Sequence, residues 1–243
     1  MNEIKVNDLT KKYKDLTAVD HVNLSIQGGE LFSVLGVNGA GKTTLIKMLS
    51  CLARPTEGDA VLNGKSITRD TQAVKAIIAV SPQETAVAPN LTVKENLELM
   101  AGVHGLDKGM RKSKASNMLE QFDLMSISEK KAKKLSGGWQ RRLSIAMALI
   151  SEPEILFLDE PTLGLDVLAR QELWRFIRSL KGKITVILTT HYMEEAEELS
   201  DRVAIMKAGK ILAVGSVDEI KKKAGTDNFE HAFVELVERG EAI

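Results

Sequence analysis

The chain has 243 residues, with 33 basic and 33 acidic side chains and one cysteine, Cys51. This length allows one large domain, or a core with an inserted subdomain, around a sizeable hydrophobic core. The balanced charge disfavours a general nucleic-acid binder, which is usually basic, and a single cysteine excludes an internal disulfide.

The apolar runs have the length of β-strands. The longest, such as AIIAV and ITVIL, are far too short to cross a bilayer, and the N-terminus MNEIKVNDL has no hydrophobic signal core. We therefore expect a soluble chain. If it works at a membrane, another protein must provide the span.

Residues 1–30 alternate apolar and polar side chains around turn-forming pairs, which predicts antiparallel strands with one buried face. LFSVL at 31–35 is a compact apolar strand that runs into glycines. Beyond them, Leu45, Met48, Leu49 and Leu52 recur at helical spacing until RPTEG ends the predicted helix. Residues 61–83 return to strand character.

The glycine segment GVNGAGKT satisfies the pattern GxxxxGK[ST] between a predicted strand and a predicted helix. Its backbone N–H groups can converge on phosphate oxygens, Lys42 can reach the β and γ phosphates, and the Thr43 hydroxyl can ligate Mg²⁺. The alternative, a glycine turn with an incidental lysine, is disfavoured by the flanking elements. The residues expected to bind ATP here are Gly36, Asn38, Gly39, Ala40, Gly41, Lys42, Thr43 and Thr44.

Residues 86–150 are predicted to be mostly helical. Thr92 and Glu95 fit a capping box, and a later stripe runs from Trp139 through Leu143 to Ile150. KLSGGWQRR begins this last helix, with Ser136 as the expected N-cap, and the capped helix start suits an anion. Arg141 and Arg142 follow directly, and solvent exposure is one interpretation of both.

EILFLDE (154–160) and KITVILTTH (183–191) are apolar runs that end in polar residues, which indicates a mostly parallel sheet with the site along that edge. Asp159 suits a Mg²⁺ partner, and Glu160 could orient and deprotonate the attacking water. A solvated loop entry is the alternative for both acids. His191 ends a strand of the same sheet, although a lone histidine is more often structural.

The remaining chain predicts a hairpin turning near Ala208 and Gly209, and a C-terminal helix capped by Asp227 or Asn228. The pattern predicts an α/β fold with a mostly parallel sheet and an N-terminal antiparallel β subdomain, and it resembles the phosphate-loop NTPase (RecA-like) class. Residues 1–85 and 151–225 would form the nucleotide-binding core, 86–150 an inserted helical subdomain, and 226–243 a short helical tail.

Five segments, GVNGAGKTT, SPQ, LSGGWQRRL, ILFLDEPTLGLD and LTTH, occur in an order and at spacings that resemble the ATP-binding cassette (ABC) ATPases. The resemblance covers roughly residues 3–225, and LSGGxQRR is its most specific element. It implies ATP and Mg²⁺ as ligands and ATP hydrolysis that drives a partner. Val37 and Trp139 depart from the commonest family pattern, at positions that supply no catalytic atom.

The resemblance also implies roles for single residues. Tyr13 would stack on the adenine, Gln83 would sense Mg²⁺, the attacking water and a transmembrane partner, and Asp166 would link two opposed sites. Glu160 matches the catalytic base and His191 the contact to the γ-phosphate. The residues that would close the nucleotide held by Lys42 of a second protomer are Ser136, Gly137, Gly138 and Gln140.

The family further implies an ATPase subunit of a membrane transporter, which dimerises around ATP and drives a separate transmembrane permease from the cytoplasmic side of the cell membrane. The short chain and its ending resemble exporters of the drug, antibiotic or sodium type. No nucleic-acid partner is expected. The alternatives are a soluble cassette ATPase acting on DNA or ribosomes, and a nucleotide switch without turnover, which Glu160 and His191 together disfavour.

Overall fold

The computed structural model describes residues 3–240, and its strands form two sheets. Residues 1–2 and 241–243, the outermost parts of the predicted core and tail, lie outside the described residues. The strands are β1 (Glu3–Tyr13), β2 (Leu16–Gln27), β3 (Leu31–Leu35), β4 (Glu57–Leu62), β5 (Lys65–Ser66), β6 (Ile78–Ser81), β7 (Ile155–Asp159), β8 (Thr185–Thr190), β9 (Arg202–Lys207) and β10 (Lys210–Gly215). The helices are α1 (Lys42–Leu49), α2 (Thr71–Lys75), α3 (Val93–Val103), α4 (Lys108–Gln121), α5 (Gly137–Leu149), α6 (Val167–Arg178), α7 (Met193–Leu199), α8 (Val217–Ala224) and α9 (Phe229–Arg239).

The larger sheet has the strand order β10-β9-β3-β8-β7-β6, and its neighbours are parallel except for β10 and β9. Strands β3, β7 and β8 are buried along their whole length, as is usual for parallel strands covered on both faces. The predicted α/β fold with a mostly parallel sheet is confirmed.

The strand register of the larger sheet brings three loop starts to one edge. Strands β3, β7 and β8 end at Leu35, Asp159 and Thr190; Leu35 pairs with Thr190, and Asp159 pairs with the residue before Thr190. The glycine segment, Glu160 and His191 follow these strand ends directly. The three segments therefore leave the sheet side by side.

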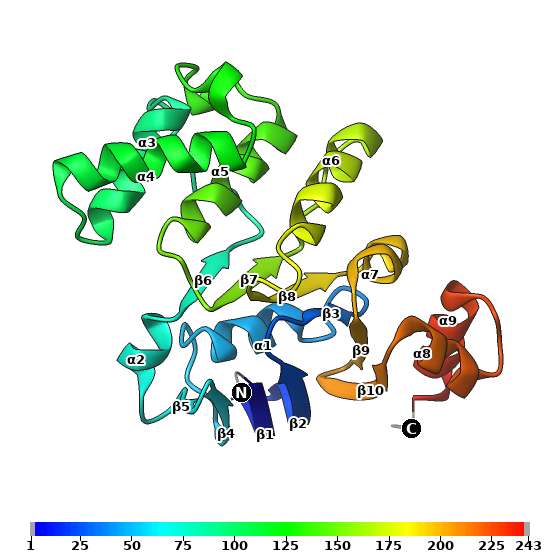
Figure 1. Ribbon diagram of the computed structural model, residues 1–243. Coiled ribbons are helices and arrows are strands. Elements are labelled where there is room, and N and C mark those ends of the chain that lie inside the picture. Colours follow the sequence, from blue (N-terminus) through cyan, green and yellow to red (C-terminus); the bar gives the residue numbers. More distant parts are fainter. Residues whose placement is uncertain (1–2, 241–243) are drawn as a thin grey trace.

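The smaller sheet, in the order β2-β1-β4-β5, is antiparallel, as predicted for residues 1–30. Helix α1 lies between the two sheets (Figure 1). Its buried Leu45 and Met48 share one hydrophobic cluster with Ile4 of β1 and Phe157 of β7. Burial against both sheets fixes the position of the N-terminus of α1, where the glycine segment ends.

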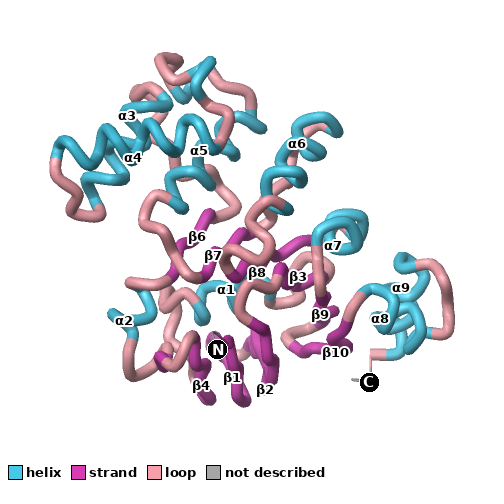
Figure 2. Tube along the Cα trace, viewed as in Figure 1, coloured by secondary structure: helices cyan, strands magenta, loops and turns pink. Residues whose placement is uncertain are grey.

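Helices α3, α4 and α5 lie together beyond β6 and β7, and all three fall within residues 86–150 (Figures 1 and 2). The predicted capping box is present: Glu95 N donates to Thr92 Oγ1 at 3.1 Å, and Thr92 N donates to Glu95 Oε2 at 2.7 Å. These contacts fix the start of α3.

Helix α5 connects this helical part to the larger sheet. Its buried Leu143 belongs to one hydrophobic cluster with Leu97 of α3, Leu119 of α4 and Leu158 of β7.

No helix among the described residues is both long and apolar enough to span a membrane.

The predicted hairpin and C-terminal helix are also present. Strands β9 and β10 turn at Ala208 and Gly209, and Asn228 Oδ1 caps α9 by accepting from His231 N at 2.9 Å.

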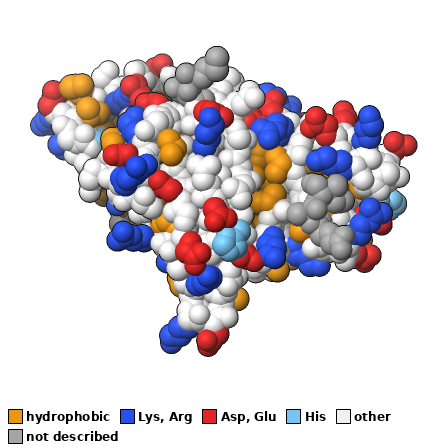
Figure 3. All heavy atoms as spheres, turned by 90° about the horizontal axis from the view of Figure 1, so that it is seen from below, with side chains coloured by type: hydrophobic (Ala, Val, Ile, Leu, Met, Phe, Trp, Pro, Cys, Tyr) orange, Lys and Arg blue, Asp and Glu red, His pale blue; other side chains and the backbone are white. Residues whose placement is uncertain are grey.

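Figure 3 views the molecule from the side of the smaller sheet, and acidic and basic side chains are interspersed over this face.

Several expected boundaries were wrong. Helix α1 ends at Leu49 rather than Leu52, because Cys51 adopts a left-handed φ of 57° and Leu52 turns outward, 66% exposed. Cys51 is thus half-buried just after the helix. Helix α2 interrupts the stretch 61–83, and α6, α7 and α8 lie where no helix was predicted.

Candidate functional site

The glycine segment runs from the end of β3 into α1, and two of its glycines leave no room for a side chain. A Cβ at Gly36 would lie 2.3 Å from Met206 O, and one at Gly41 would lie 2.2 Å from Ala18 O. Gly41 also has a φ of 106°, which disfavours any residue with a Cβ. The backbone can therefore follow the tight path that points the first N–H groups of α1 toward an anion.

Lys42 lies at the first position of α1 with its side chain only 5% exposed. Its ammonium donates to Gly36 O at 2.7 Å and to Val37 O at 3.3 Å, and it lies 3.4 Å from Glu160 Oε1. The charge is held over the loop that would surround a phosphate chain. An anion arriving there would compete with two carbonyl groups for the same ammonium protons.

Thr43 and Asp159 meet beside Lys42. Thr43 Oγ1 donates to Asp159 Oδ1 at 3.2 Å, and Thr189 Oγ1 donates to the same oxygen. One carboxylate and one hydroxyl oxygen match the hard donors that Mg²⁺ accepts when substrate phosphates supply further ligands. These residues fit the predicted Mg²⁺ position.

Glu160 connects Lys42 to His191. Its carboxylate lies 3.4 Å from Lys42 Nζ through Oε1 and 2.9 Å from His191 Nδ1 through Oε2. The backbone of Glu160 is left-handed, with a φ of 45°, and its N–H donates to both the carbonyl and the hydroxyl of Thr189, each at 3.1 Å. The predicted base thus occupies a strained position beside the phosphate loop.

A cavity of about 700 Å³ opens over these groups. Its lining includes Gln83, Glu160 and His191 beside the glycine segment, so the structure brings most predicted ATP-site residues together. Tyr13 is not among the described lining residues: it is 45% exposed, with Lys11 Nζ 4.9 Å from its ring centroid. Its cross-strand partner Leu16 does line the cavity.

The segment 136–138 opens α5 at a different place. Ser136 is the N-cap residue of α5, as predicted, but its side chain is exposed and makes no capping hydrogen bond. Gly137 and Gln140 line a separate cavity of about 380 Å³, which shares Gln83 and Glu160 with the first. The exposed hydroxyl of Ser136 is accessible to another donor or acceptor.

Three further predicted residues have observable structural contacts. Gln140 Nε2 donates to Ala132 O and Leu135 O, each at 3.2 Å, and holds the turn before α5. A Cβ at Gly138 would lie 2.8 Å from Ala169 Cβ, so this glycine allows α6 to approach. Asp166 Oδ1 caps α6 by accepting from Ala169 N at 2.9 Å.

The model of the ABC transporter family matches residues 19–163. The daunorubicin resistance ATP-binding protein DrrA3 of Streptomyces coeruleorubidus is 42% identical over 241 residues, covering 99% of this chain and 76% of the relative. This chain belongs to the ABC transporter family.

Solved structures place the cassette in the same family. A structure described as the ATP binding subunit of an ABC transporter has a TM-score of 0.84 and 29% identity, covering 96% of this chain and 99% of that one. The ATP-binding cassette MJ0796, solved as a dimer in a post-hydrolysis state with ADP and Pi, has a TM-score of 0.78 and 29% identity, covering 88% and 98%. The chain is an ABC-type ATPase, and these relatives give no support to the DNA or ribosome alternative.

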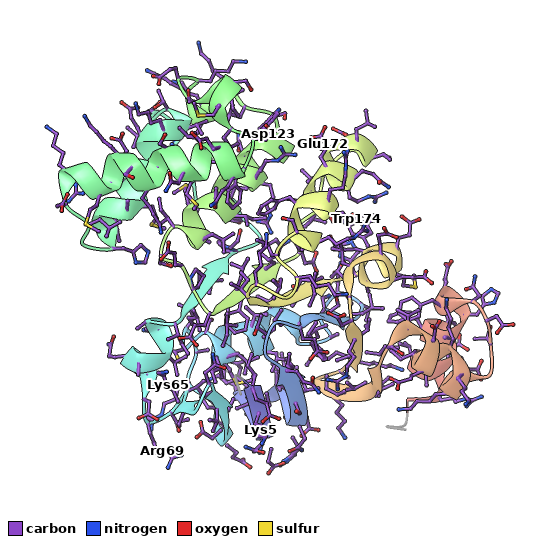
Figure 4. The ribbon with its side chains drawn as sticks, in the orientation of Figure 1. Lys5, Lys65, Arg69, Asp123, Glu172 and Trp174 are labelled. Atoms are coloured by element: carbon purple, nitrogen blue, oxygen red, sulfur yellow. The ribbon has the colours of Figure 1, made fainter. Side chains whose placement is uncertain are left out.

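One buried charge of the cassette was missed by the sequence analysis. Arg141 does not face solvent: it is 3% exposed and donates to backbone carbonyls on both sides of Glu160. Arg142, one residue on, binds Glu172 of α6 at 3.1 Å and lies 4.7 Å from the Trp139 ring (Figure 4 labels Glu172). The signal was the run LSIAMALI, apolar on all sides of the helix, which indicates that α5 is buried all round.

Glu195 of α7 is a second buried charge that the sequence analysis missed. Trp174 Nε1 donates to Glu195 Oε1 at 3.1 Å, while Oε2 has no hydrogen-bond partner among residues 3–240 (Figure 4 labels Trp174). Burial desolvates the carboxylate and raises the pKa of Glu195 above its ordinary value of 4.5.

A Glu195→Gln variant is expected to become more stable relative to the parent as the pH rises. The folded parent binds a proton more tightly than the unfolded chain, so its free energy of unfolding falls as the pH increases above 4.5, whereas an amide does not ionise. Denaturant unfolding at pH 5 and pH 8 measures the effect, with the exposed Glu197→Gln as the matched control. A stability difference that is the same at both pH values would contradict a raised pKa.

Proposed function

We propose that this cassette is the ATP-hydrolysing subunit of an exporter, and that two copies enclose two MgATP and drive a separate transmembrane permease. The observation that carries the catalytic part is the contact of Glu160 with both Lys42 and His191 beside the phosphate loop. The proposed location is the cytoplasmic side of the cell membrane, where the cassette is held by its permease.

In the proposed reaction, Lys42 and the first N–H groups of α1 bind the β and γ phosphates. Glu160 accepts a proton from the attacking water, and His191 orients the Glu160 carboxylate and contacts the γ-phosphate. Mg²⁺, held by Thr43 and Asp159 with Gln83 nearby, supplies charge neutralisation on the phosphates when bound. Tyr13 would stack on the adenine from the end of β1.

The second half of each ATP site comes, in this proposal, from the other copy. The helix start at 136–138 carries an exposed serine and N–H groups that have no partner within the helix. None of these three residues is among the described lining of the cavity over Lys42 of the same chain. A helix N-terminus attracts a phosphate group, so a head-to-tail dimer would place it on the partner's γ-phosphate. Asp166, in the exposed turn before α6, would link the two sites, and the dimeric MJ0796 relative supports this arrangement.

The exporter assignment rests on the relatives. The DrrA3 relative is named for daunorubicin resistance, which supports a drug or antibiotic exporter for this chain as well. We also propose that residues 1–85 and 151–225 form the nucleotide-binding core, 86–150 an inserted helical subdomain that carries the segment 136–138, and 226–243 a short helical tail.

Purification of the tagged full-length chain from detergent-solubilised membranes of its native cells tests the transporter function. We expect an integral membrane protein with about six apolar helices to co-purify, and Mg²⁺-dependent ATP hydrolysis to respond to it. Co-purification with ribosomes or DNA and no integral membrane protein would contradict this proposal.

A further inference from the structure

The guanidinium group of Arg141 connects helix α5 to two other segments of the candidate ATP site, residues 82–83 and residues 159–161. Nη2 donates to Asp159 O at 2.7 Å, and Nε donates to Pro161 O at 2.9 Å. Nη1 donates to Gln83 O at 3.2 Å and to Pro82 O. All four acceptors are backbone carbonyls. The side chain therefore fixes the path of the backbone and does not neutralise a carboxylate.

Two of these carbonyls flank Glu160. The residue before it, Asp159, and the residue after it, Pro161, both accept from Arg141, while the Glu160 N–H is held by Thr189 of β8. Glu160 has a φ of 45°, a conformation that a residue with a Cβ adopts only when its surroundings impose it. Arg141 on one side and β8 on the other supply that constraint.

The other two carbonyls belong to the segment that carries Gln83. Arg141 itself lies in the second turn of α5, about 4.5–7.5 Å along the helix axis from residues 136–138. A displacement of α5 against a second protomer's nucleotide would therefore act on the Glu160 turn through one rigid side chain.

Burial lowers the pKa of Arg141 to about 10, which still leaves the guanidinium charged at neutral pH. A charged planar donor with several N–H groups can bind several carbonyls at once, whereas a lysine ammonium on a flexible stem cannot reproduce that fork. The geometry is thus specific to arginine.

We propose that Arg141 is a positioning residue for hydrolysis, which holds the backbone on both sides of Glu160 and ties it to the Gln83 segment and to α5. This inference rests on the proposed role of Glu160 as the base. Arg141 does not line the cavity over Lys42, and in this proposal it acts through the carbonyls that it binds.

The test compares Arg141→Lys with Arg142→Lys in the purified full-length chain. Both keep the charge, but among residues 3–240 the Arg142 guanidinium binds only the Glu172 side chain and the Trp139 ring, contacts that a lysine can retain. We expect Arg141→Lys to lower kcat about 10- to 100-fold, because small misplacement of a catalytic group has that effect. KM and the ATP dissociation constant should stay within about threefold, which marks a loss confined to the transition state.

Arg142→Lys should keep kcat and KM within about twofold, and thermal melting should show that both variants are folded. An unchanged kcat in Arg141→Lys, or an equal loss of ATP affinity and kcat, would overturn the proposal. If the lysine variant does not fold, Arg141→Gln is measured in the same way. Failure of both to fold would show that the bonds serve only stability and would also overturn it.

Glu160→Gln, measured in parallel, separates the two proposals. If it still hydrolyses ATP at the parent rate, the base is assigned wrongly whatever Arg141→Lys does. If it is inactive and Arg141→Lys is fully active, only the positioning role of Arg141 fails.

Discussion

Glu160→Gln is expected to lower the kcat of ATP hydrolysis about 10²- to 10⁴-fold, the range for loss of a general base. The amide keeps the size of the side chain and an oxygen acceptor for His191, 2.9 Å away in the parent, but it cannot take a proton from water. Binding of ATP should be preserved, since the phosphate loop and Lys42 are untouched. Steady-state hydrolysis and ATP titration by calorimetry measure the two effects.

The same variant is expected to accumulate as an ATP-bound dimer, because the step that would release the two copies no longer occurs. Size-exclusion chromatography with light scattering, with and without ATP, reports this state. Glu194→Gln is the control: Glu194 lies at the same sheet edge but is exposed and pairs with Arg170 at 3.5 Å. Hydrolysis at the parent rate by Glu160→Gln would rule Glu160 out as the base.

Most of the fold could be predicted because its signals are local. The buried strands β3, β7 and β8 are continuous apolar runs, and the polar residues at their ends mark one edge of a parallel sheet. Helix α6 was missed although its buried Leu173, Trp174 and Ile177 recur at helical spacing, a signal that was present in the sequence. Leu52 followed the helical spacing of α1 but lies beyond the left-handed Cys51, a backbone state that the sequence spacing does not report.

The catalytic site was predictable to the extent that its parts are contiguous motifs. Lys42, Thr43 and Glu160 each follow a strand or a glycine turn that the sequence displays, and the register of the sheet brings them together. Arg141 was not predictable in this way. Its acceptors are backbone carbonyls in two distant segments, and a carbonyl acceptor leaves no signature in the identity of a side chain.

Lys42→Ala is expected to weaken ATP binding about 10- to 100-fold, since a charge-assisted hydrogen bond contributes about 1.5–3 kcal/mol and each 1.4 kcal/mol is tenfold. The lost binding energy should be that of the contacts with the phosphate groups of the nucleotide. The ammonium lies over the glycine segment, 2.7 Å from Gly36 O, so ADP and ATP should lose affinity while adenosine should not. Hydrolysis should fall further than binding, because the cation 3.4 Å from Glu160 is also removed.

Calorimetric titration with ATP, ADP and adenosine distinguishes this local effect from a general loss of structure. Lys47→Ala is the matched control, because Lys47 lies on the same helix α1 but is exposed in its last turn. Removing Lys42 also leaves Glu160 with His191 alone as its side-chain partner among the described residues, so the variant should lose some thermal stability without unfolding. Unchanged ATP affinity in Lys42→Ala would exclude the glycine segment as the phosphate site, since the only buried ammonium described there would then make no contact with the phosphates.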